Sequence, residues 1–264
     1  MNDYKPKNIE EYKKWLQEKH KIEISERTLV HYDSVTSKVK RDFEGSVFWI
    51  QLTKNLREFD SVYNLEKHYP LFISDLKPEV YIKPFDSFLL KTARKNILEN
   101  ICWPNEPDGG WVLPNNWFSR INDIIRTLLK VKYLDGVGFL IDRIHVHCEQ
   151  HGMPCEVFLQ AREEGYYAAH LYTKQEFEIP RFTWDTENVE MSVEIQITTQ
   201  LQEVIRRLLH KYYEERRGRL KEEDTKWQWN YESDEFIANY LGHILHYVEG
   251  MIMEVREKQK EATL

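Results

Sequence analysis

The chain has 264 residues, of which 41% are hydrophobic and 31% are charged, and its formal net charge is −7 at pH 7. This composition suits one large domain with its own core, and the acidic total excludes a protein that coats nucleic acid over its whole surface, although a local basic patch stays compatible with it. No segment approaches the run of about 20 apolar residues that a membrane-spanning helix needs. The N-terminal residues lack the apolar centre of a secretory signal, so we expect a cytoplasmic protein with no membrane partner.

Helical patterns dominate the first third of the chain. Residues 8–20 place Ile9, Tyr12, Trp15 and Leu16 on one face at α-helical spacing. Residues 31–69 form a longer amphipathic pattern, which we expect Gly45 to bend. The apolar side predicted for this longer pattern consists of Val35, Val39, Phe43, Val47, Ile50 and Leu56.

A short strand and a helix are predicted within the stretch 79–96. Val80 and Ile82 alternate with other residues, Pro84 interrupts the strand, and a helical run begins near Asp86. The next segment, 100–117, is rich in proline, glycine and asparagine. Its length of about 18 residues is typical of a functional or mobile loop.

The pattern then changes to that of a strand at 120–134, where apolar residues occupy alternate positions, although Leu128 and Leu129 leave a helix open. A helix is predicted from Asp135, a good N-cap residue, to Gly152, which ends it. Three further strands and two final helices are expected at 155–162, 165–179, 189–199, about 200–219 and about 234–258.

This order of elements predicts an α/β (α+β) fold with one mixed central sheet flanked by helices. We expect three parts along the chain: a helical N-terminal region at 1–75 that packs on the core, the core itself at 76–220, and a C-terminal helical extension at 221–264.

Cations and a hydroxyl gather around the predicted strand-to-helix turn. Lys83, Ser87, Lys91 and Arg94 follow one another at spacings of three or four residues. A helix N-terminus with lysines and a hydroxyl favours phosphate groups, because the free N–H groups, the helix dipole and the ammonium charges all attract anions. The alternative is an ordinary solvated basic helix face.

Two carboxylates occupy positions where strands deliver them to the sheet. Asp123, followed by Arg126, stands at the mouth of the central strand, where a carboxylate can hold Mg²⁺. Glu194 and Gln196 share one face of a later strand, because alternate residues point the same way. The alternatives are a capping or salt-bridging aspartate and an exposed sheet face.

An aromatic and an imidazole side chain share a face of another strand. Gly165 permits a tight turn, and Tyr166 and His170 then lie at even spacing. A tyrosine on a sheet face can stack on a nucleobase. The alternative is that both rings pack in a half-buried sheet.

In this combination and order, the motifs resemble those of the synthetase domain of the RelA/SpoT family. The resemblance covers roughly residues 76–213, and its most specific parts are "GYYAAH" and "VEIQITT" followed by "LLHKYYEERR". The family transfers the terminal diphosphate of ATP to a ribose 3′-hydroxyl, usually that of GDP or GTP. The resemblance therefore implies a nucleotidyltransferase-like fold, ATP as the donor and Mg²⁺ as the cofactor.

The resemblance assigns roles to three groups of residues. The ATP-binding group consists of Lys83, Ser87, Lys91, Arg94 and Arg126. The catalytic group consists of Asp123, Glu194 and Gln196, of which Asp123 and Glu194 are also the implied metal ligands. The acceptor-binding residues are Tyr166, which stacks on the base, and His170. Whether Glu194 holds the metal or takes the proton of the 3′-hydroxyl stays open at this point.

The sequence departs from the family pattern at several arginines. Tyr81, Tyr167 and Thr198 stand where the family usually has arginine, and Arg126 stands two places before the usual arginine of its strand. Tyr81 implies that the adenine contacts differ. These departures are similar to those of the toxic small synthetases of toxin–antitoxin systems, several of which modify the 3′ end of tRNA. A basic surface for tRNA would come from Arg206, Arg207, Lys211, Arg216, Arg217 and Arg219, unless they belong to an ordinary solvated helix.

The function that the resemblance implies is a Mg²⁺-dependent pyrophosphokinase. Its expected acceptor is the 3′ end of tRNA, which would make the protein a translation-blocking toxin with a neutralising antitoxin as partner. One alternative is a small alarmone synthetase acting on a guanine nucleotide, GDP or GTP. The other is a nucleotide-binding module without catalytic activity.

Overall fold

A computed structural model describes residues 5–73, 77–182, 185–207 and 227–261. Its centre is a five-stranded sheet with the strand order β1-β2-β5-β4-β3, in which β2 and β5 are parallel and the other neighbours are antiparallel. The strands are β1 Val80–Ile82, β2 Ile125–Val131, β3 Cys155–Ala161, β4 Tyr167–Pro180 and β5 Thr186–Thr199. The predicted mixed sheet is therefore confirmed.

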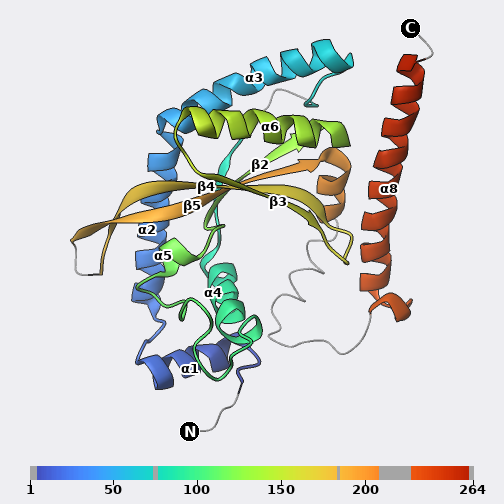
Figure 1. The fold of residues 1–264 in the computed structure, drawn as a ribbon. Coiled ribbons are helices and arrows are strands. Elements are labelled where there is room, and N and C mark those ends of the chain that lie inside the picture. The colour runs from blue at the N-terminus through green and yellow to red at the C-terminus, as the bar shows by residue number, and fades with distance from the viewer. Residues whose placement is uncertain (1–4, 74–76, 183–184, 208–226, 262–264) are drawn as a thin grey trace.

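Helices cover both faces of this sheet (Figure 1). The α-helices are α1 Ile9–His20, α2 Glu26–Glu44, α3 Val47–Lys67, α4 Phe85–Ala93, α5 Trp117–Arg120, α6 Leu134–Gln150 and α8 Asp234–Glu261. A π-helical turn, Arg94–Leu98, continues α4, a short 3₁₀ turn spans Trp227–Trp229, and residues 200–207 are also helical. Helices α6 and α3 lie on one face, α4 and α5 on the other, and α8 stands beside one end of the sheet. No helix in the described ranges is long and apolar enough to cross a bilayer.

Strand β2 shows which face of the sheet is left for polar chemistry. Ile125, Thr127, Leu129 and Val131 are buried, and the residues between them are only partly buried. Because alternate side chains point to opposite faces, this alternation excludes the helical alternative for the segment and directs Arg126 to the face opposite the apolar core.

The long N-terminal helix predicted to bend at Gly45 is two helices, so that expectation was wrong. Gly45 caps the end of α2, and Ser46 begins α3 by accepting a hydrogen bond from the Trp49 backbone N–H at 3.2 Å. The break changes the rotational phase of the apolar pattern. Val47 and Ile50, which were predicted to be on the apolar side, are therefore 64% and 40% exposed.

Asp135 is not the N-cap of α6, because Tyr133 occupies that position and Asp135 lies in the first turn. The Asp135 carboxylate instead accepts a hydrogen bond of 2.6 Å from the Tyr69 hydroxyl. The Asp135 side chain, which local propensity assigns to helix capping, is thus held by a tertiary contact with Tyr69 in the segment after α3.

Candidate active site

Two lysines converge on one carboxylate at the end of the sheet where β1 and β2 meet α4. The Lys83 Nζ lies 3.0 Å from Asp123 Oδ2, and the Lys91 Nζ lies 2.8 Å from Asp123 Oδ1. Lys83 follows β1, and its backbone N–H donates to the Ile124 carbonyl at 2.8 Å, so the pairing of β1 with β2 places it beside Asp123. The structure therefore brings together three of the predicted site residues.

Burial and charge compete within this cluster. Lys83 is 8% exposed, and burial lowers its pKa although Asp123 acts in the opposite direction. Burial alone would raise the pKa of Asp123, but the charges of Lys91 and Lys83 outweigh it and bring the pKa to about 2. Asp123 is thus an anion at neutral pH, held between two ammonium groups in a poorly solvated place.

Helix α4 presents its N-terminus beside these lysines. Pro84 occupies the N-cap position and provides no side-chain cap, and Ser87 lies in the first turn, one turn before Lys91. The first N–H groups of a helix have no intrahelical acceptor, so they favour an anion. Arg94, the first residue of the π-helical turn, pairs with Glu99 and not with Asp123. Its Nε lies 4.0 Å from Glu99 Oε1.

A second cluster surrounds Glu194, which is 2% exposed. Its Oε1 accepts hydrogen bonds from His170 Nδ1 at 2.6 Å and from the Tyr172 hydroxyl at 2.9 Å, and its Oε2 accepts one from Gln196 Nε2 at 2.9 Å. The β4–β5 register pairs His170 with Gln196 and Tyr172 with Glu194, which puts all four side chains on one face. The Tyr166 hydroxyl lies 3.5 Å from His170 Nε2. Of the residues predicted for catalysis and acceptor binding, all except Asp123 therefore lie in this cluster around the Glu194 carboxylate.

Sequence reasoning missed Tyr172, which contacts Glu194 directly. The signal that identifies it is its alternate spacing with His170, which places both on one strand face. Burial, followed by the charge and hydrogen bond of Glu194, raises the pKa of Tyr172, and the charge of Asp123 acts in the same direction. Tyr172 therefore stays a hydrogen-bond donor, and both predicted carboxylates lie close enough to influence it.

A groove of about 920 Å³ continues the site across β1, β2 and β5. Arg126 pairs in register with Glu194 on one side and with Tyr81 on the other, so the three side chains form one row on the sheet. Tyr81 is 49% exposed, and its hydroxyl donates to Glu79 Oε2 at 2.8 Å. The groove is lined by Tyr81, Arg126 and Gln196 together with residues of the helical segment 200–207.

Two arginines of the predicted basic stripe line this groove. Arg206 and Arg207 both bind the buried Glu203, at 2.6 and 2.8 Å. This ion pairing reduces their free positive charge, as on an ordinary helix surface. The remaining members of the predicted stripe, Lys211, Arg216, Arg217 and Arg219, lie outside the described residues.

The donor atoms present fit Mg²⁺ bound together with a substrate. Asp123 and Glu194 supply carboxylate oxygens, and the described part of the chain has no group of three or more histidine, cysteine or acidic side chains that could hold a metal ion. Mg²⁺ is commonly bound by one or two carboxylates plus substrate phosphates, with no all-protein cage. Two carboxylates, with substrate phosphate oxygens as the remaining ligands, match that pattern.

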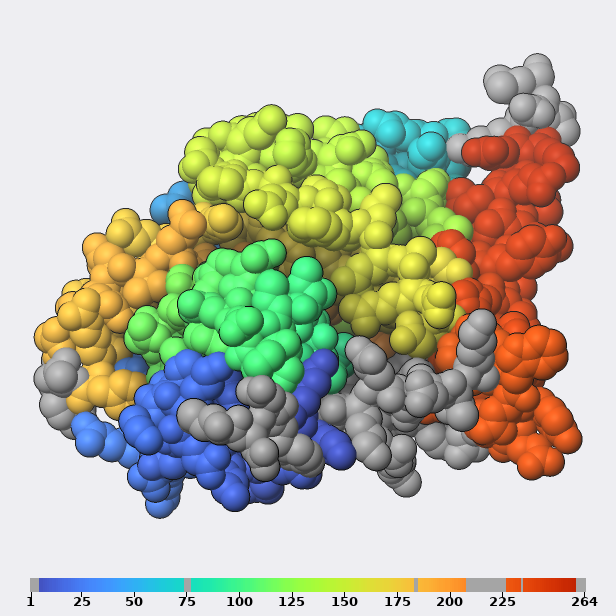
Figure 2. Space-filling model, turned by 60° about the horizontal axis from the view of Figure 1, so that its bottom comes forward, coloured from blue at the N-terminus to red at the C-terminus, as the bar shows by residue number. Residues whose placement is uncertain are grey.

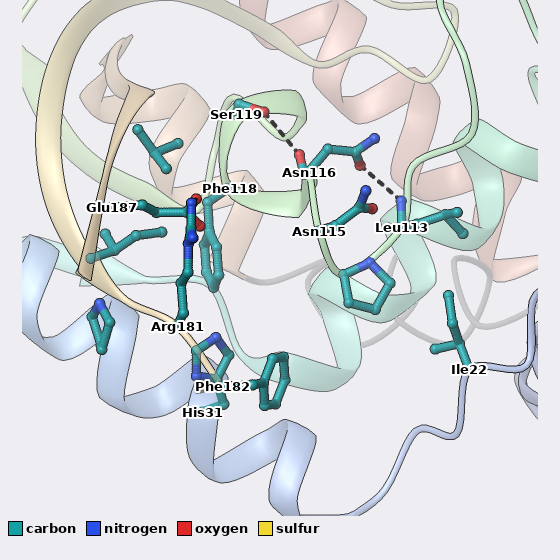
Figure 3. Close-up of a pocket in the computed structure, with 14 residues that line it drawn as sticks. Ile22, His31, Leu113, Asn115, Asn116, Phe118, Ser119, Arg181, Phe182 and Glu187 are labelled. Atoms are coloured by element: carbon teal, nitrogen blue, oxygen red, sulfur yellow. Dashed lines mark hydrogen bonds and ion pairs between the residues drawn. The ribbon is translucent and has the colours of Figure 1, made fainter. Parts of the chain in front are cut away.

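A separate hollow of about 670 Å³ lies by the tip of the β4–β5 hairpin and is lined by none of the predicted site residues (Figure 3). His31 stacks on Phe182 there with a ring separation of 3.8 Å. The Asn116 side chain accepts a hydrogen bond from the Leu113 N–H at 2.8 Å and so stabilises its own loop. This hollow therefore contains none of the chemistry that the sequence predicts.

Comparison with solved structures identifies the fold. Small alarmone synthetase 1 from Bacillus subtilis, bound to its product pppGpp, matches with a TM-score of 0.53 and 15% identity over 89% of this chain and 97% of that one. A GTP pyrophosphokinase family protein from Streptococcus pneumoniae matches with a TM-score of 0.51 and 16% identity, over 90% and 95% of the two chains. Small alarmone synthetase 2 from B. subtilis gives 0.51 and 16%, over 86% and 99%.

The chain therefore has the fold of the small alarmone synthetases, and the resemblance to RelA/SpoT synthetases is confirmed at the level of the fold. No protein-family model matches the sequence. No curated protein matches it either.

Proposed function

We propose that this protein is a Mg²⁺-dependent pyrophosphokinase that transfers the terminal diphosphate of ATP to a ribose 3′-hydroxyl. The observation that carries the proposal is the convergence of Lys83 and Lys91 on Asp123, together with a buried Glu194 that is held by three donors. The likeness of the fold to proteins named alarmone synthetase and GTP pyrophosphokinase supports it.

In this reaction the acceptor 3′-oxygen attacks the β-phosphorus of ATP. The bond between that phosphorus and the oxygen bridging to the α-phosphate breaks, AMP leaves, and the hydroxyl loses its proton. Lys83 and Lys91 hold the negatively charged triphosphate through their ammonium groups, and the Ser87 hydroxyl adds a hydrogen-bond donor. Mg²⁺ bound to Asp123 and Glu194 would neutralise part of the negative charge of the phosphates.

The three hydrogen bonds to Glu194 hold its carboxylate in one orientation. A carboxylate in a fixed orientation suits either of the two roles that the sequence leaves open, metal ligand or proton acceptor. Each role requires the carboxylate oxygens to be held at a defined position. Substitution of Asp123, Glu194 or Tyr166 by alanine is expected to abolish transfer, whereas full activity in all three variants would contradict these assignments.

The acceptor that we propose is the 3′ end of tRNA. Tyr166 stacks on a base without regard to its identity, so the terminal adenine of tRNA suits it. Tyr167 and Thr198 stand where the resembling family has arginines near a guanine nucleotide, which weakens the case for GDP or GTP. Modified tRNA is not aminoacylated, so the protein would act as a translation-blocking toxin, with an antitoxin protein as its partner.

The second candidate function is synthesis of an alarmone from GDP or GTP. The structural likeness to small alarmone synthetases favours it, one of them being bound to pppGpp. Offering tRNA and GTP in parallel with γ-labelled ATP separates the two. Label in acid-precipitable RNA supports the tRNA acceptor, and label in a free guanosine nucleotide supports the alarmone. Mg²⁺-dependent ATP binding with no transfer to either acceptor would indicate the catalytically inactive module.

A further inference from the structure

We propose that helix α8 positions the acceptor-binding residue Tyr166, and that Gly242 is the positioning residue through which it does so. The inference rests on the proposed function, because it takes Tyr166 as the contact to the acceptor base. The C-terminal helix α8 thereby acts only on the part of the site that binds the acceptor. The residues around Asp123 come from β1, α4 and the approach to β2.

The loop before Tyr166 touches the backbone of α8. Gly165 has a φ of +73° and closes a turn in which its N–H donates to the Arg162 carbonyl at 2.9 Å. A Cβ added at Gly242 would lie 2.3 Å from the Gly165 carbonyl oxygen, and one added at Gly165 would lie 2.4 Å from the Asn239 carbonyl oxygen. Both glycines are therefore required by the contact, since backbone atoms cannot move aside as a flexible side chain can.

Groups on both sides of Tyr166, the Tyr167 side chain and the Glu163 backbone carbonyl, strengthen this contact. The Tyr167 ring stacks on His246 with a centroid separation of 3.6 Å and an interplanar angle of 7°. The Tyr167 hydroxyl donates to His243 Nδ1 at 2.8 Å, and His243 Nε2 donates to the Glu163 carbonyl at 2.7 Å. One neutral tautomer of His243 satisfies both bonds. In Figure 2 the β3–β4 segment (yellow) lies against α8 (red).

The loop is thus held on two sides, by the sheet and by α8. The Arg162 N–H donates to the Tyr166 carbonyl at 3.1 Å on the sheet side, and Gly165 rests on Gly242 on the other. Stacking on Tyr166 contributes to how tightly the acceptor base is bound, so a displaced ring weakens binding of the acceptor. A helix that fixes the loop therefore governs the affinity for the acceptor.

The test compares Gly242→Ala with Gly250→Ala. Both substitutions add a methyl group to α8 and raise its helix propensity equally, but a Cβ at Gly250 meets no atom within 4 Å. We expect Gly242→Ala to weaken stacking on Tyr166, and so to raise the KM for the acceptor by about tenfold or more and to leave the KM for ATP unchanged. Gly250→Ala should match the wild type. An unchanged acceptor KM in Gly242→Ala, or an equal rise for ATP, would overturn the proposal.

Two additional measurements separate this inference from the proposed function and from misfolding. Amide hydrogen exchange at residues 162–166 needs no activity, and it should be faster in Gly242→Ala than in Gly250→Ala; equal exchange would contradict the inference even if no acceptor is found. Tyr167→Phe removes only the bond to His243, and it should raise the acceptor KM about threefold. If Gly242→Ala does not fold, an unaltered acceptor KM in Tyr167→Phe overturns the proposal instead.

Discussion

The Tyr172 hydroxyl donates a hydrogen bond of 2.9 Å to Oε1 of Glu194, its direct partner across β4 and β5. A hydrogen bond to a charged group contributes about 1.5–3 kcal/mol. We therefore expect Tyr172→Phe to lower the rate constant of diphosphate transfer about tenfold or more, with little change in the KM for ATP. Tyr247→Phe, at a tyrosine that is 70% exposed on α8, is the matched control. Equal rates in both variants would show that the Tyr172 bond does not matter.

Asp123 makes the stability of the fold depend on pH in a defined range. Its folded-state pKa of about 2 lies below its usual 3.8, so the ionised form stabilises the fold above pH 4 and the stabilisation is lost as pH falls towards 2. The shift corresponds to about 2 kcal/mol. Urea unfolding at pH 6 and pH 3 should show that the stability advantage of the wild type over Asp123→Asn falls by about half.

Asp142→Asn provides the control for this experiment, because Asp142 is exposed on α6. Its stability difference from the wild type should stay small at both pH values. A difference between the wild type and Asp123→Asn that does not change from pH 6 to pH 3 would contradict the ion pairing of Asp123 with the two lysines.

Tyr81 provides a test of the nucleotide groove. Its ring stands in the row formed with Arg126 and Glu194, whereas its hydroxyl contacts only Glu79 among the hydrogen bonds described. If the ring stacks on adenine, Tyr81→Ala should raise the Kd for ATP about tenfold, since stacking contributes about 1–3 kcal/mol. Tyr81→Phe should bind ATP as the wild type does. A titration with a fluorescent ATP analogue measures both, and an unaffected alanine variant would place adenine elsewhere.

Lys19 anchors the loop that follows the π-helical turn. Its Nζ lies 4.4 Å from the centre of the Trp111 ring and donates to the Pro104 carbonyl at 2.9 Å. A cation over a tryptophan face contributes about 0.5–1 kcal/mol at an exposed site. Lys19→Met should lower the free energy of unfolding by about that amount in a urea titration. Lys14→Met, at a side chain that is 75% exposed, should have no comparable effect.

The elements of the sheet could be predicted because each carries its own local pattern. Alternation in β2 and the even spacing of Glu194 and Gln196 follow from strand geometry, and both are found in the structure. The turn that carries Lys83 and Lys91 was also predictable, since proline and the change of period mark where the strand ends. These features are encoded in the local sequence pattern and can be recognised without knowledge of tertiary contacts.

The remaining features depend on how distant segments meet. The bond between Tyr172 and Glu194 requires the β4–β5 register, and the contact of Gly165 with Gly242 joins a turn to a helix far along the chain. Neither residue spacing nor composition specifies such a pairing. The end of α2 at Gly45 was misjudged because the apolar periodicity on its two sides is equally helical, and only the cap at Ser46 shows that a new helix begins.

In the proposed reaction a diphosphate, and no other group, is transferred from ATP to the acceptor. Parallel reactions with α-labelled and γ-labelled ATP, each with tRNA and with GTP, measure this directly. We expect the γ-label at the 3′ end of one acceptor and the α-label in AMP. Release of ADP together with the labelled acceptor, or transfer of the α-label with release of pyrophosphate, would contradict the proposed reaction.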